Sequence, residues 1–439
     1  MRPRSPMALG SHYSTHKNQR TVKWYNLSMS RIILCLDLDA FYASVEELLH
    51  PEWRGLPLLV GGRPDERGVV SSCSYAARKF GIHSAMPMAQ ALRLCPQAIR
   101  ASPHFEVYSD YSQRVMAAVR EYGCTMEQVS VDEVFLDATD CIVVPRTPLR
   151  GVPNALPPEG GATALATEIK YRLREQIGLP CTIGVASNKL IAKIASTVGK
   201  PDGLIEVPAG DEARFLAPLP IGQLWGVGKK GAAKLQAMGI YSIGDLQNAP
   251  LAKLRQEFGD WALDLQQRAR GAGSDLVETD HEQKSISRET TFARNVGSLE
   301  PLKRVLLSLS EQVGRDLRDE GLQARTIAIK LRWPDFTTIT RQTTLSHPTD
   351  ATSDIYQAAT ALLTAAMKRG ARVRLIGVRA ANLSSGRQLG FFESDTEKRA
   401  RADKAVDEIR ERFGDKAIRR AALVRKTDRG RHAPRTDHR

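Results

Sequence analysis

The chain has 439 residues, which is enough for two to four domains that each bury a core of their own. No apolar run approaches eighteen residues and no secretion-type segment is present, which argues for a soluble protein that is not exported, with the cytoplasm as the expected compartment. The six cysteines include no CxxC pair, which argues against a zinc cluster or a disulfide framework and favours buried thiols.

The net charge of +14 is spread unevenly along the chain. Residues 31–283 carry slightly more acidic than basic side chains, whereas residues 284–387 and both ends carry an excess of basic ones. An enzyme that grips a polyanion with one module and does chemistry in another would have this distribution. A protein with a basic surface that binds no nucleic acid would account for this charge distribution equally well.

The first elements follow a polar, basic and aperiodic stretch, residues 1–28, for which we expect a disordered arm. Residues 32–36 form an apolar run typical of a buried strand, which ends in Asp37-Leu38-Asp39. Asp39 is placed to cap a helix that has an apolar face made of Phe41, Val45 and Leu48. Strands are also predicted near residues 57–62 and 68–73, and the second enters a short helix at Ser74, whose free N–H groups suit an anion.

A second group of acids, Asp132 and Glu133, lies at the turn between two short strands in residues 127–137. Burying two such charges is costly unless a cation shares them. If this hairpin lies beside the first strand, then Asp37, Asp132 and Glu133 form a cage of hard oxygen ligands that suits Mg²⁺ and substrate phosphates. Two such ions suit in-line phosphoryl transfer, although acids at strand ends are more often ordinary turn residues.

The order of the next elements predicts a ferredoxin-like fold. A Pro- and Gly-rich loop over residues 144–161 precedes a helix over 162–177, a strand over 181–186 and a helix over 188–198 that Ser187 caps. Lys200 follows this helix and is placed to interact with its C-terminus.

Short helices are predicted over residues 204–275, and within them residues 224–240 have the form of a helix-hairpin-helix. The glycines at 226 and 228, followed by Lys229 and Lys230, would let backbone N–H groups approach a DNA phosphate closely. A plain Gly-rich connection between helices is the alternative.

A second βαββαβ order is predicted over residues 284–385, with strands near 285–292, 326–333, 337–345 and 373–382 and helices near 299–320 and 352–368. One face of this sheet can pack on the helices while the other meets solvent or DNA. The apolar residues at 388–392 lie in a polar stretch, where they suit a partner's pocket or a fold back onto their own domain. Residues 397–424 are predicted as a charged helix with an apolar face of Ala405, Val406, Ile409 and Phe413, followed by a disordered basic tail.

The two acidic segments, residues 37–47 and 130–133, resemble the Y-family of translesion DNA polymerases of the DinB type, and the resemblance runs from about residue 30 to about residue 420. It implies an α+β multidomain fold. The implied parts are a ferredoxin-like palm (29–203) with small fingers inserted at about 51–105, a helix-hairpin-helix thumb (204–280), a βαββαβ little finger (284–385), a clamp-binding peptide (386–393) and a charged helical segment with a basic tail (394–439).

The resemblance also implies roles for single residues. Asp37 and Asp132 would bridge two Mg²⁺ ions, with the Leu38 carbonyl on the nucleotide-side ion and Glu133 on the primer-side ion. Tyr42 occupies the sugar-gate position beside Phe41. The other implied residues are Tyr75, Arg78 and Lys200 for the triphosphate, Gly226, Gly228, Lys229, Lys230 and Arg341 for DNA, and Gln388, Leu389, Phe391 and Phe392 for a sliding clamp, with Phe391 where leucine is more usual.

The implied reaction is template-directed, low-fidelity DNA synthesis, in which the primer 3′-hydroxyl of a primer-template attacks a deoxynucleoside triphosphate. Two alternative functions come from other classes of protein. In a nucleotidyl cyclase, the helix-hairpin-helix and the basic second module would have no purpose. In a clamp-linked adaptor without activity, the acids Asp37, Asp132 and Glu133 would not be needed. We expect a monomer that binds no membrane.

Overall fold

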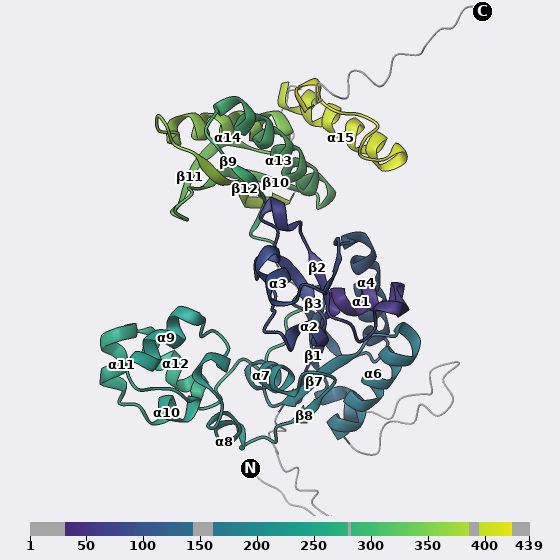
Figure 1. Cartoon of the computed structure of the whole chain (residues 1–439), viewed down its shortest axis with the longest axis vertical. Coiled ribbons are helices and arrows are strands. Elements are labelled where there is room, and N and C mark those ends of the chain that lie inside the picture. Colours follow the sequence, from purple (N-terminus) through teal and green to yellow (C-terminus); the bar gives the residue numbers. More distant parts are fainter. Residues whose placement is uncertain (1–30, 144–160, 280–281, 386–394, 424–439) are drawn as a thin grey trace, which may run out of the picture.

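The computed structural model of the chain describes residues 31–143, 161–279, 282–385 and 395–423 (Figure 1). The arm predicted over residues 1–28, the clamp-binding peptide and the basic tail from residue 424 lie outside these ranges. None of the helices within them combines the length and the apolar character that crossing a bilayer requires.

The first sheet, which we call the palm sheet, has the strand order β5-β6-β1-β7-β8. Its central strand β1 alternates between two cores: Leu34 and Leu36 pack on one side with α4 and α6, and Ile33 and Cys35 pack on the other side with α7. Because both faces are covered, β1 has the continuous apolar sequence from which it was predicted. The order of β5, β6, β1 and β7 is that of a ferredoxin-like fold, which confirms that expectation. The strands are β1 (Ile33–Leu38), β5 (Thr125–Gln128), β6 (Glu133–Asp137), β7 (Cys181–Ala186) and β8 (Leu204–Glu206).

A smaller sheet of order β3-β2-β4, which we call the fingers sheet, is inserted between α1 and α4. It has its own small core, which includes Leu59, Cys73 and Met88. The sequence predicted β2 and β3, but β4, α3 and α4 were not expected. The elements of this region and of the palm helices are α1 (Phe41–Leu49), β2 (Leu58–Gly61), β3 (Val70–Cys73), α2 (Tyr75–Arg78), α3 (Met88–Leu94), β4 (Ile99–Ala101), α4 (Phe105–Arg120), α5 (Thr139–Val143), α6 (Gly161–Ile177) and α7 (Lys189–Gly199).

Two predicted helix caps are wrong. The N-cap of α1 is Ala40, in the left-handed region at φ 47°, and no side chain caps this helix. Asp39 instead lies buried and accepts hydrogen bonds from other elements. At α7 the cap is Asn188, whose side chain accepts from the backbone N–H of Ile191 at 3.1 Å, while the Ser187 hydroxyl donates to Glu212. The short helix predicted to begin near Ser74 is confirmed as α2, and the Ser74 hydroxyl caps it by accepting from Ala77 N.

The thumb is a bundle of short helices that packs on α7 and on the outer face of the palm sheet. Its elements are α8 (Glu212–Leu216), α9 (Lys229–Ala237), α10 (Ile243–Asn248), α11 (Leu251–Phe258) and α12 (Trp261–Ala269). Gly226 has a φ of +97° in the turn before α9, a conformation that favours glycine over any residue with a Cβ atom.

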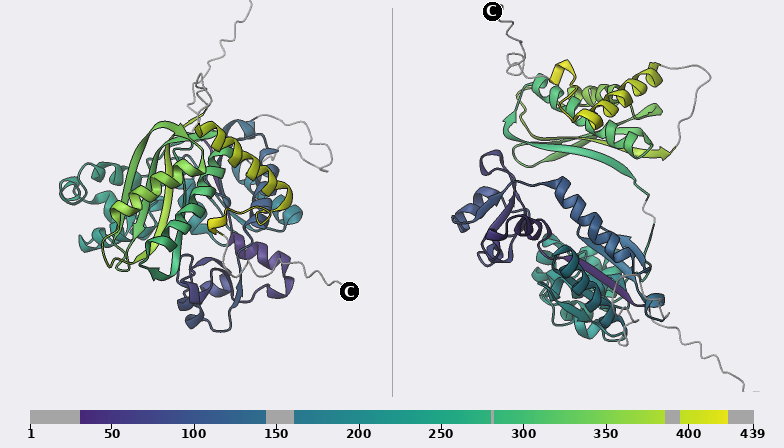
Figure 2. Two further views of the ribbon diagram at one scale, coloured as in Figure 1. Left: turned by 90° about the horizontal axis from the view of Figure 1, so that it is seen from above. Right: turned by 90° about the vertical axis from the view of Figure 1, so that its right-hand side faces the viewer.

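The last sheet, which we call the little-finger sheet, has the order β11-β10-β12-β9. Helices α13 and α14 cover one face, and the other face is turned toward the fingers (Figure 2). The predicted βαββαβ order is confirmed, with β9 (Ser285–Val296), α13 (Leu299–Asp319), β10 (Leu322–Arg332), β11 (Thr338–Thr349), α14 (Thr352–Ala366) and β12 (Val373–Ser385).

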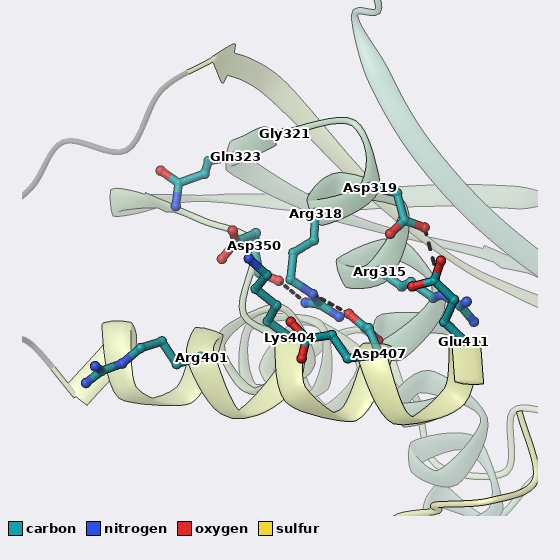
Figure 3. Close-up of a pocket in the computed structure, with 11 residues that line it drawn as sticks. Arg315, Arg318, Asp319, Gly321, Gln323, Asp350, Arg401, Lys404, Asp407 and Glu411 are labelled. Atoms are coloured by element: carbon teal, nitrogen blue, oxygen red, sulfur yellow. Dashed lines mark hydrogen bonds and ion pairs between the residues drawn. The ribbon is translucent and has the colours of Figure 1, made fainter. Parts of the chain in front are cut away.

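The charged C-terminal helix α15 (Asp395–Phe413) lies against the helical side of this sheet (Figure 3). It ends at Phe413 rather than near residue 424, and Gly414 follows with a φ of +86°. The apolar face predicted for α15 does not hold it against the little-finger helices, because Ile409 and Phe413 of that face are exposed. The helix is held instead by Asp403, which is 6% exposed, and by Asp407, which pairs with Arg318 of α13 at 2.7 Å.

The cysteines follow the prediction in part. Four of them, Cys35, Cys73, Cys95 and Cys181, are buried thiols. Cys124 and Cys141, however, are joined by a disulfide beside the open end of the β5–β6 hairpin. The sequence missed this pair because the two residues are brought together only when the hairpin folds.

Candidate active site

The two acidic segments meet in the palm sheet. In the pairing of β1 with β6, Asp37 lies opposite Glu133, as the sequence predicted for two strands side by side. The ammonium group of Lys193, on α7, lies 2.7 Å from Asp37 Oδ2 and 2.7 Å from Glu133 Oε2. Lys200 donates a further hydrogen bond to Asp37 Oδ1. Two carboxylates therefore share one cation, and one of them holds a second.

Lys193 is largely buried, and burial by itself lowers the pKa of an ammonium group. Interactions with Asp37, Cys35 and Glu133 together outweigh this effect and raise the pKa of Lys193 above its ordinary value. The lysine therefore stays charged beside the acids. Lys193 could not be singled out from the sequence, because it lies in the middle of a helix whose pattern shows only that this face contacts the sheet.

Asp132 occupies the turn before β6, and its carbonyl accepts a hydrogen bond from Leu38 N at 2.9 Å. Its carboxylate accepts from the Ser130 hydroxyl at 2.6 Å. It also lies near Tyr42, where burial first and the negative charge of Asp132 second raise the pKa of the phenol. Asp132 thus interacts with Ser130 and lies near Tyr42, whereas Asp37 and Glu133 bond to Lys193 of α7.

The expected cage of three acids is not assembled with the side chains as they stand. In the described ranges, no group of three or more His, Cys, Asp or Glu side chains lies close enough together to hold a metal ion. Lys193 bonds to both Asp37 and Glu133, Lys200 bonds to Asp37, and Asp132 bonds to Ser130 instead. The donor set nevertheless fits Mg²⁺, because all the ligands are hard oxygens and two of them already share a cation.

Asp39 is a buried carboxylate that the sequence analysis read as a helix cap. It is 1% exposed and accepts hydrogen bonds from Tyr75 Oη at 3.0 Å, Thr182 Oγ1 at 3.0 Å and Asp202 N at 2.8 Å. These bonds connect α2 to the loop that carries Lys200. The only signal in the sequence was the second acid of Asp37-Leu38-Asp39, and a cap would have accounted for it locally.

The three residues expected at a triphosphate lie around this carboxylate. Burial and the negative charge of Asp39 raise the pKa of Tyr75, so its phenol remains a donor. The guanidinium group of Arg78 is exposed and lies 4.7 Å from the centre of the Tyr75 ring. Lys200 reaches the same region through its bond to Asp37. The structure thus brings Tyr75, Arg78 and Lys200 to one side of the acids.

Tyr42 and Phe41 differ in their surroundings. Tyr42 is partly exposed and stacks on Tyr108 of α4, with 4.3 Å between ring centres. Phe41 is 3% exposed and packs in the core of the palm, so its ring does not reach the surface on which a nucleotide would lie. The Phe41 side chain therefore packs in the palm core, and its expected contact with a nucleotide stays a prediction.

The positions expected to contact DNA are divided between two surfaces. In the thumb, Gly228 is the N-cap of α9, and Lys229 and Lys230 are exposed at the start of that helix. In the little-finger sheet, Arg341 pairs with Ile329, which lies in the core beneath the helices. Since residues paired across antiparallel strands share a face, Arg341 lies on the helical side at the sheet edge and not on the open face. The open face carries Lys330, Arg332 and Arg379, which the sequence analysis did not name.

Comparison with known proteins places these features in a family. The model of the impB/mucB/samB family matches residues 36–197, the C-terminal domain of the same family matches residues 283–391, and the helix-hairpin-helix motif of the IMS family matches residues 209–240. The matched motif contains Gly226 and Gly228, as expected for the thumb.

Among curated relatives, the DNA polymerase IV of Dehalococcoides mccartyi (strain CBDB1) is 36% identical over 399 residues, which are 91% of this chain and 99% of that protein. The DNA polymerase IV of Alkalilimnicola ehrlichii is 39% identical over 82% of this chain and 99% of that protein. Among solved structures, a Y-family DNA polymerase chimera has a TM-score of 0.69 at 27% identity and covers 81% of this chain and all of that one. The insertion ternary complex of Dbh DNA polymerase has a TM-score of 0.56 at 26% identity, with the same coverage.

The family models thus cover the palm, the thumb and the little finger in the order of this chain, and the curated relatives match over nearly their whole length. The fold of the solved relatives agrees with the ferredoxin-like palm and the added C-terminal sheet. The chain belongs to the Y-family of translesion DNA polymerases, together with the DNA polymerase IV proteins.

Proposed function

We propose that Asp37, Asp132 and Glu133 are the residues with which this polymerase holds two Mg²⁺ ions and adds deoxynucleotides to a primer 3′-hydroxyl. The observation that carries the proposal is the single ammonium group placed 2.7 Å from both Asp37 and Glu133, because it marks a position where two carboxylates accept one cation. When bound, the ions would lower the pKa of the attacking hydroxyl and neutralise charge on the phosphates. The Leu38 carbonyl, next to Asp37, would complete the oxygen ligands.

The protein's own part in the reaction is positioning. Tyr75, Arg78 and Lys200 would bind the triphosphate with a phenol, a guanidinium and an ammonium group. Asp39 supports this role, since it fixes the Tyr75 hydroxyl and the backbone of the Lys200 loop at the same buried carboxylate. Tyr42 would lie under the deoxyribose and exclude a ribose by overlap with its 2′-hydroxyl.

For DNA, we propose two contacts that position the duplex without reading its sequence. The N-terminus of α9, with Lys229 and Lys230, would bind phosphates on the thumb side. The open face of the little-finger sheet, with Lys330, Arg332 and Arg379, would bind them on the other side. This face replaces Arg341 as the site of the predicted contact.

The metal assignment is tested by Asp132→Asn and Glu133→Gln in a primer-extension assay. Each change keeps the volume of the side chain and removes the charge, so we expect extension to fall by on the order of 10³ or more while binding to primer-template survives. Glu127→Gln is the matched control: Glu127 is a buried acid of the same hairpin that pairs with Lys189 rather than with Lys193. If both variants at 132 and 133 extend within tenfold of the wild type, the two-metal assignment is wrong.

We also propose that a sliding clamp binds Gln388, Leu389, Phe391 and Phe392, which follow the last strand of the little finger. The support is chemical: four apolar or amide side chains in a polar stretch suit a partner's pocket. Replacing all four with alanine should abolish stimulation by a loaded clamp, because anchors of this kind often carry about 2 kcal/mol or more of binding energy. Phe413→Ala, an exposed aromatic in α15, is the control. Undiminished stimulation would show that the segment is not the clamp contact.

A further inference from the structure

A buried carboxylate lies behind Tyr42, one turn further along α1. Glu46 is fully buried. Its Oε1 atom accepts hydrogen bonds from the Tyr108 hydroxyl and from His104 Nδ1, the latter at 2.8 Å. Its Oε2 atom has no hydrogen-bond partner among the described residues. A carboxylate at this site is therefore only half satisfied.

Such a group is unfavourable for stability alone. Taking a carboxylate out of water is costly, and a buried oxygen without a partner adds to the cost. An apolar side chain of similar size would fill the same space in the palm core without this penalty. The carboxylate therefore suggests a need for the bonds it makes, and the one of its two partners that is itself buried is the Tyr108 hydroxyl, since His104 is half exposed.

Tyr108 connects this carboxylate to the proposed sugar gate. Its ring is 1% exposed and lies parallel to the ring of Tyr42, with 4.3 Å between the centres and 15° between the planes. Phe105 meets Tyr42 edge-on, with 6.0 Å between the centres. Burial first, and the bond to Glu46 second, raise the pKa of Tyr108, so its phenol stays protonated and donates. Without the bond to Glu46, no hydrogen bond would fix the Tyr108 ring, and only its packing in the palm core, against Tyr42, Phe41 and Phe105 among others, would hold it.

We infer that Glu46, acting through the hydroxyl of Tyr108, is a positioning residue for Tyr42 and thereby sets how strictly ribonucleotides are rejected. The inference rests on the proposed role of Tyr42 as the sugar gate. Exclusion of a 2′-hydroxyl by overlap depends steeply on the position of the gate ring, because a few tenths of an ångström relieve most of a close contact. The Tyr42 ring cannot shift in this way while a hydrogen bond holds the Tyr108 ring beside it in place, but it can shift when that hydrogen bond is missing.

The test compares incorporation of ribonucleotides and deoxynucleotides opposite the same template base. Glu46→Met keeps the length of the side chain and removes the acceptor, and Tyr108→Phe keeps the stacked ring and removes the donor. In each variant we expect the ratio of kcat/KM for the ribonucleotide to that for the deoxynucleotide to rise by about tenfold, the usual effect of losing one partner of a buried hydrogen bond. The double variant should show no larger rise than either single one, because both remove the same bond.

Two further variants separate this role from a general loss of packing. Glu46→Gln keeps an oxygen that accepts the Tyr108 hydroxyl, so it should restore the discrimination of the wild type. Tyr122→Phe removes another tyrosine hydroxyl of the palm core, which bonds to Glu168 at 3.4 Å, and it should leave the ratio unchanged. A rise as large in Tyr122→Phe as in Tyr108→Phe would overturn the inference.

Tyr42→Ala, measured in the same reactions, distinguishes failure of this inference from failure of the proposed gate. If Tyr42→Ala loses discrimination but Glu46→Met and Tyr108→Phe do not, the gate stands and the positioning role of Glu46 is overturned. If Tyr42→Ala discriminates as the wild type does, the gate and the positioning role both fall. Should Glu46→Met fail to fold, Tyr108→Phe decides the question, since it removes a single oxygen atom.

Discussion

Lys193 is the residue on which the charge balance of the active site depends. Its ammonium group lies between Asp37 and Glu133, and all three side chains are largely shielded from solvent. Two carboxylates this close together would repel one another if no cation lay between them. Lys193 thus stabilises the site in the absence of metal, and it does so with the same carboxylate oxygens that the proposed metals would use.

We expect Lys193→Met to lower the free energy of unfolding by about 2–3 kcal/mol, because two acids lose their common partner. This loss is somewhat smaller than the loss expected when a fully buried ion pair is broken. Mg²⁺ should recover more of the melting temperature in this variant than in the wild type, since a divalent cation can replace the missing charge. Thermal unfolding with and without Mg²⁺ measures both effects.

Lys189→Met is the matched control for this prediction. Lys189 lies one turn earlier on α7 and pairs with Glu127 at 2.8 Å, in surroundings that are about as buried. Its loss should also lower the melting temperature, but Mg²⁺ should not recover it preferentially. Equal gains from Mg²⁺ in the wild type and in Lys193→Met would contradict the assignment of these carboxylates as metal ligands.

At the scale of elements, α15 shows that a helix can be held by paired charges where an apolar face was expected. Asp403 accepts the backbone N–H of Thr352 at the start of α14, and Glu311 of α13 pairs with Arg410 and Arg420. Figure 3 shows Arg318 reaching from α13 toward Asp407 on α15. These groups are mostly shielded, so their attraction is stronger than that of surface pairs, but it remains sensitive to salt.

We therefore expect α15 to detach before the rest of the little finger when salt is raised. Between about 0.1 M and about 1 M salt, the range of electrostatic interactions falls from about 10 Å to about 3 Å. Hydrogen exchange of the amides of residues 401–413 should accelerate by about tenfold, while exchange in β10, whose strand is buried by apolar contacts, should not change. Exchange in α15 that is independent of salt would show that its apolar contacts hold it after all.

At the scale of the whole molecule, one arginine connects the fingers to the little finger. Arg67 follows β2 in the fingers and donates to Asn295 Oδ1 at 2.8 Å and to the Phe292 carbonyl at 3.3 Å, both in β9. Figure 2 shows the fingers reaching the little-finger sheet at this end of the molecule. The contact joins parts of the chain more than two hundred residues apart.

Removing this contact should let the little finger move away from the fingers in the DNA-free protein. Arg67→Ala should increase the radius of gyration in small-angle X-ray scattering without lowering the melting temperature of either part, because the side chain contributes to neither core. Arg63→Ala is the control, since Arg63 pairs with Asp65 within its own loop. An unchanged radius of gyration in Arg67→Ala would show that other contacts hold the two parts together.

Much of the fold and of the site was determined by the sequence alone. The apolar run of β1, the hairpin at Asp132 and Glu133 and the second βαββαβ order could be predicted because they depend on local periodicity and on turn residues. The meeting of Asp37 with Glu133 was expected if the two segments lie side by side: Asp37 lies near the end of β1 and Glu133 begins β6, so antiparallel pairing brings the two acids to the same end of the sheet.

Only the tertiary structure decided which partners the polar side chains chose. Asp39 could cap a helix or bond to Tyr75, and Asp403 could face water or Thr352 N, and each option satisfies the same local pattern. The side of the little-finger sheet on which Arg341 lies depends on its register with β10, because a shift of one residue reverses the face. Folding brings together ammonium groups and carboxylates that lie far apart in the sequence. The partners of Lys193 therefore follow from the packing of α7 against the sheet and not from any pattern in the sequence around it.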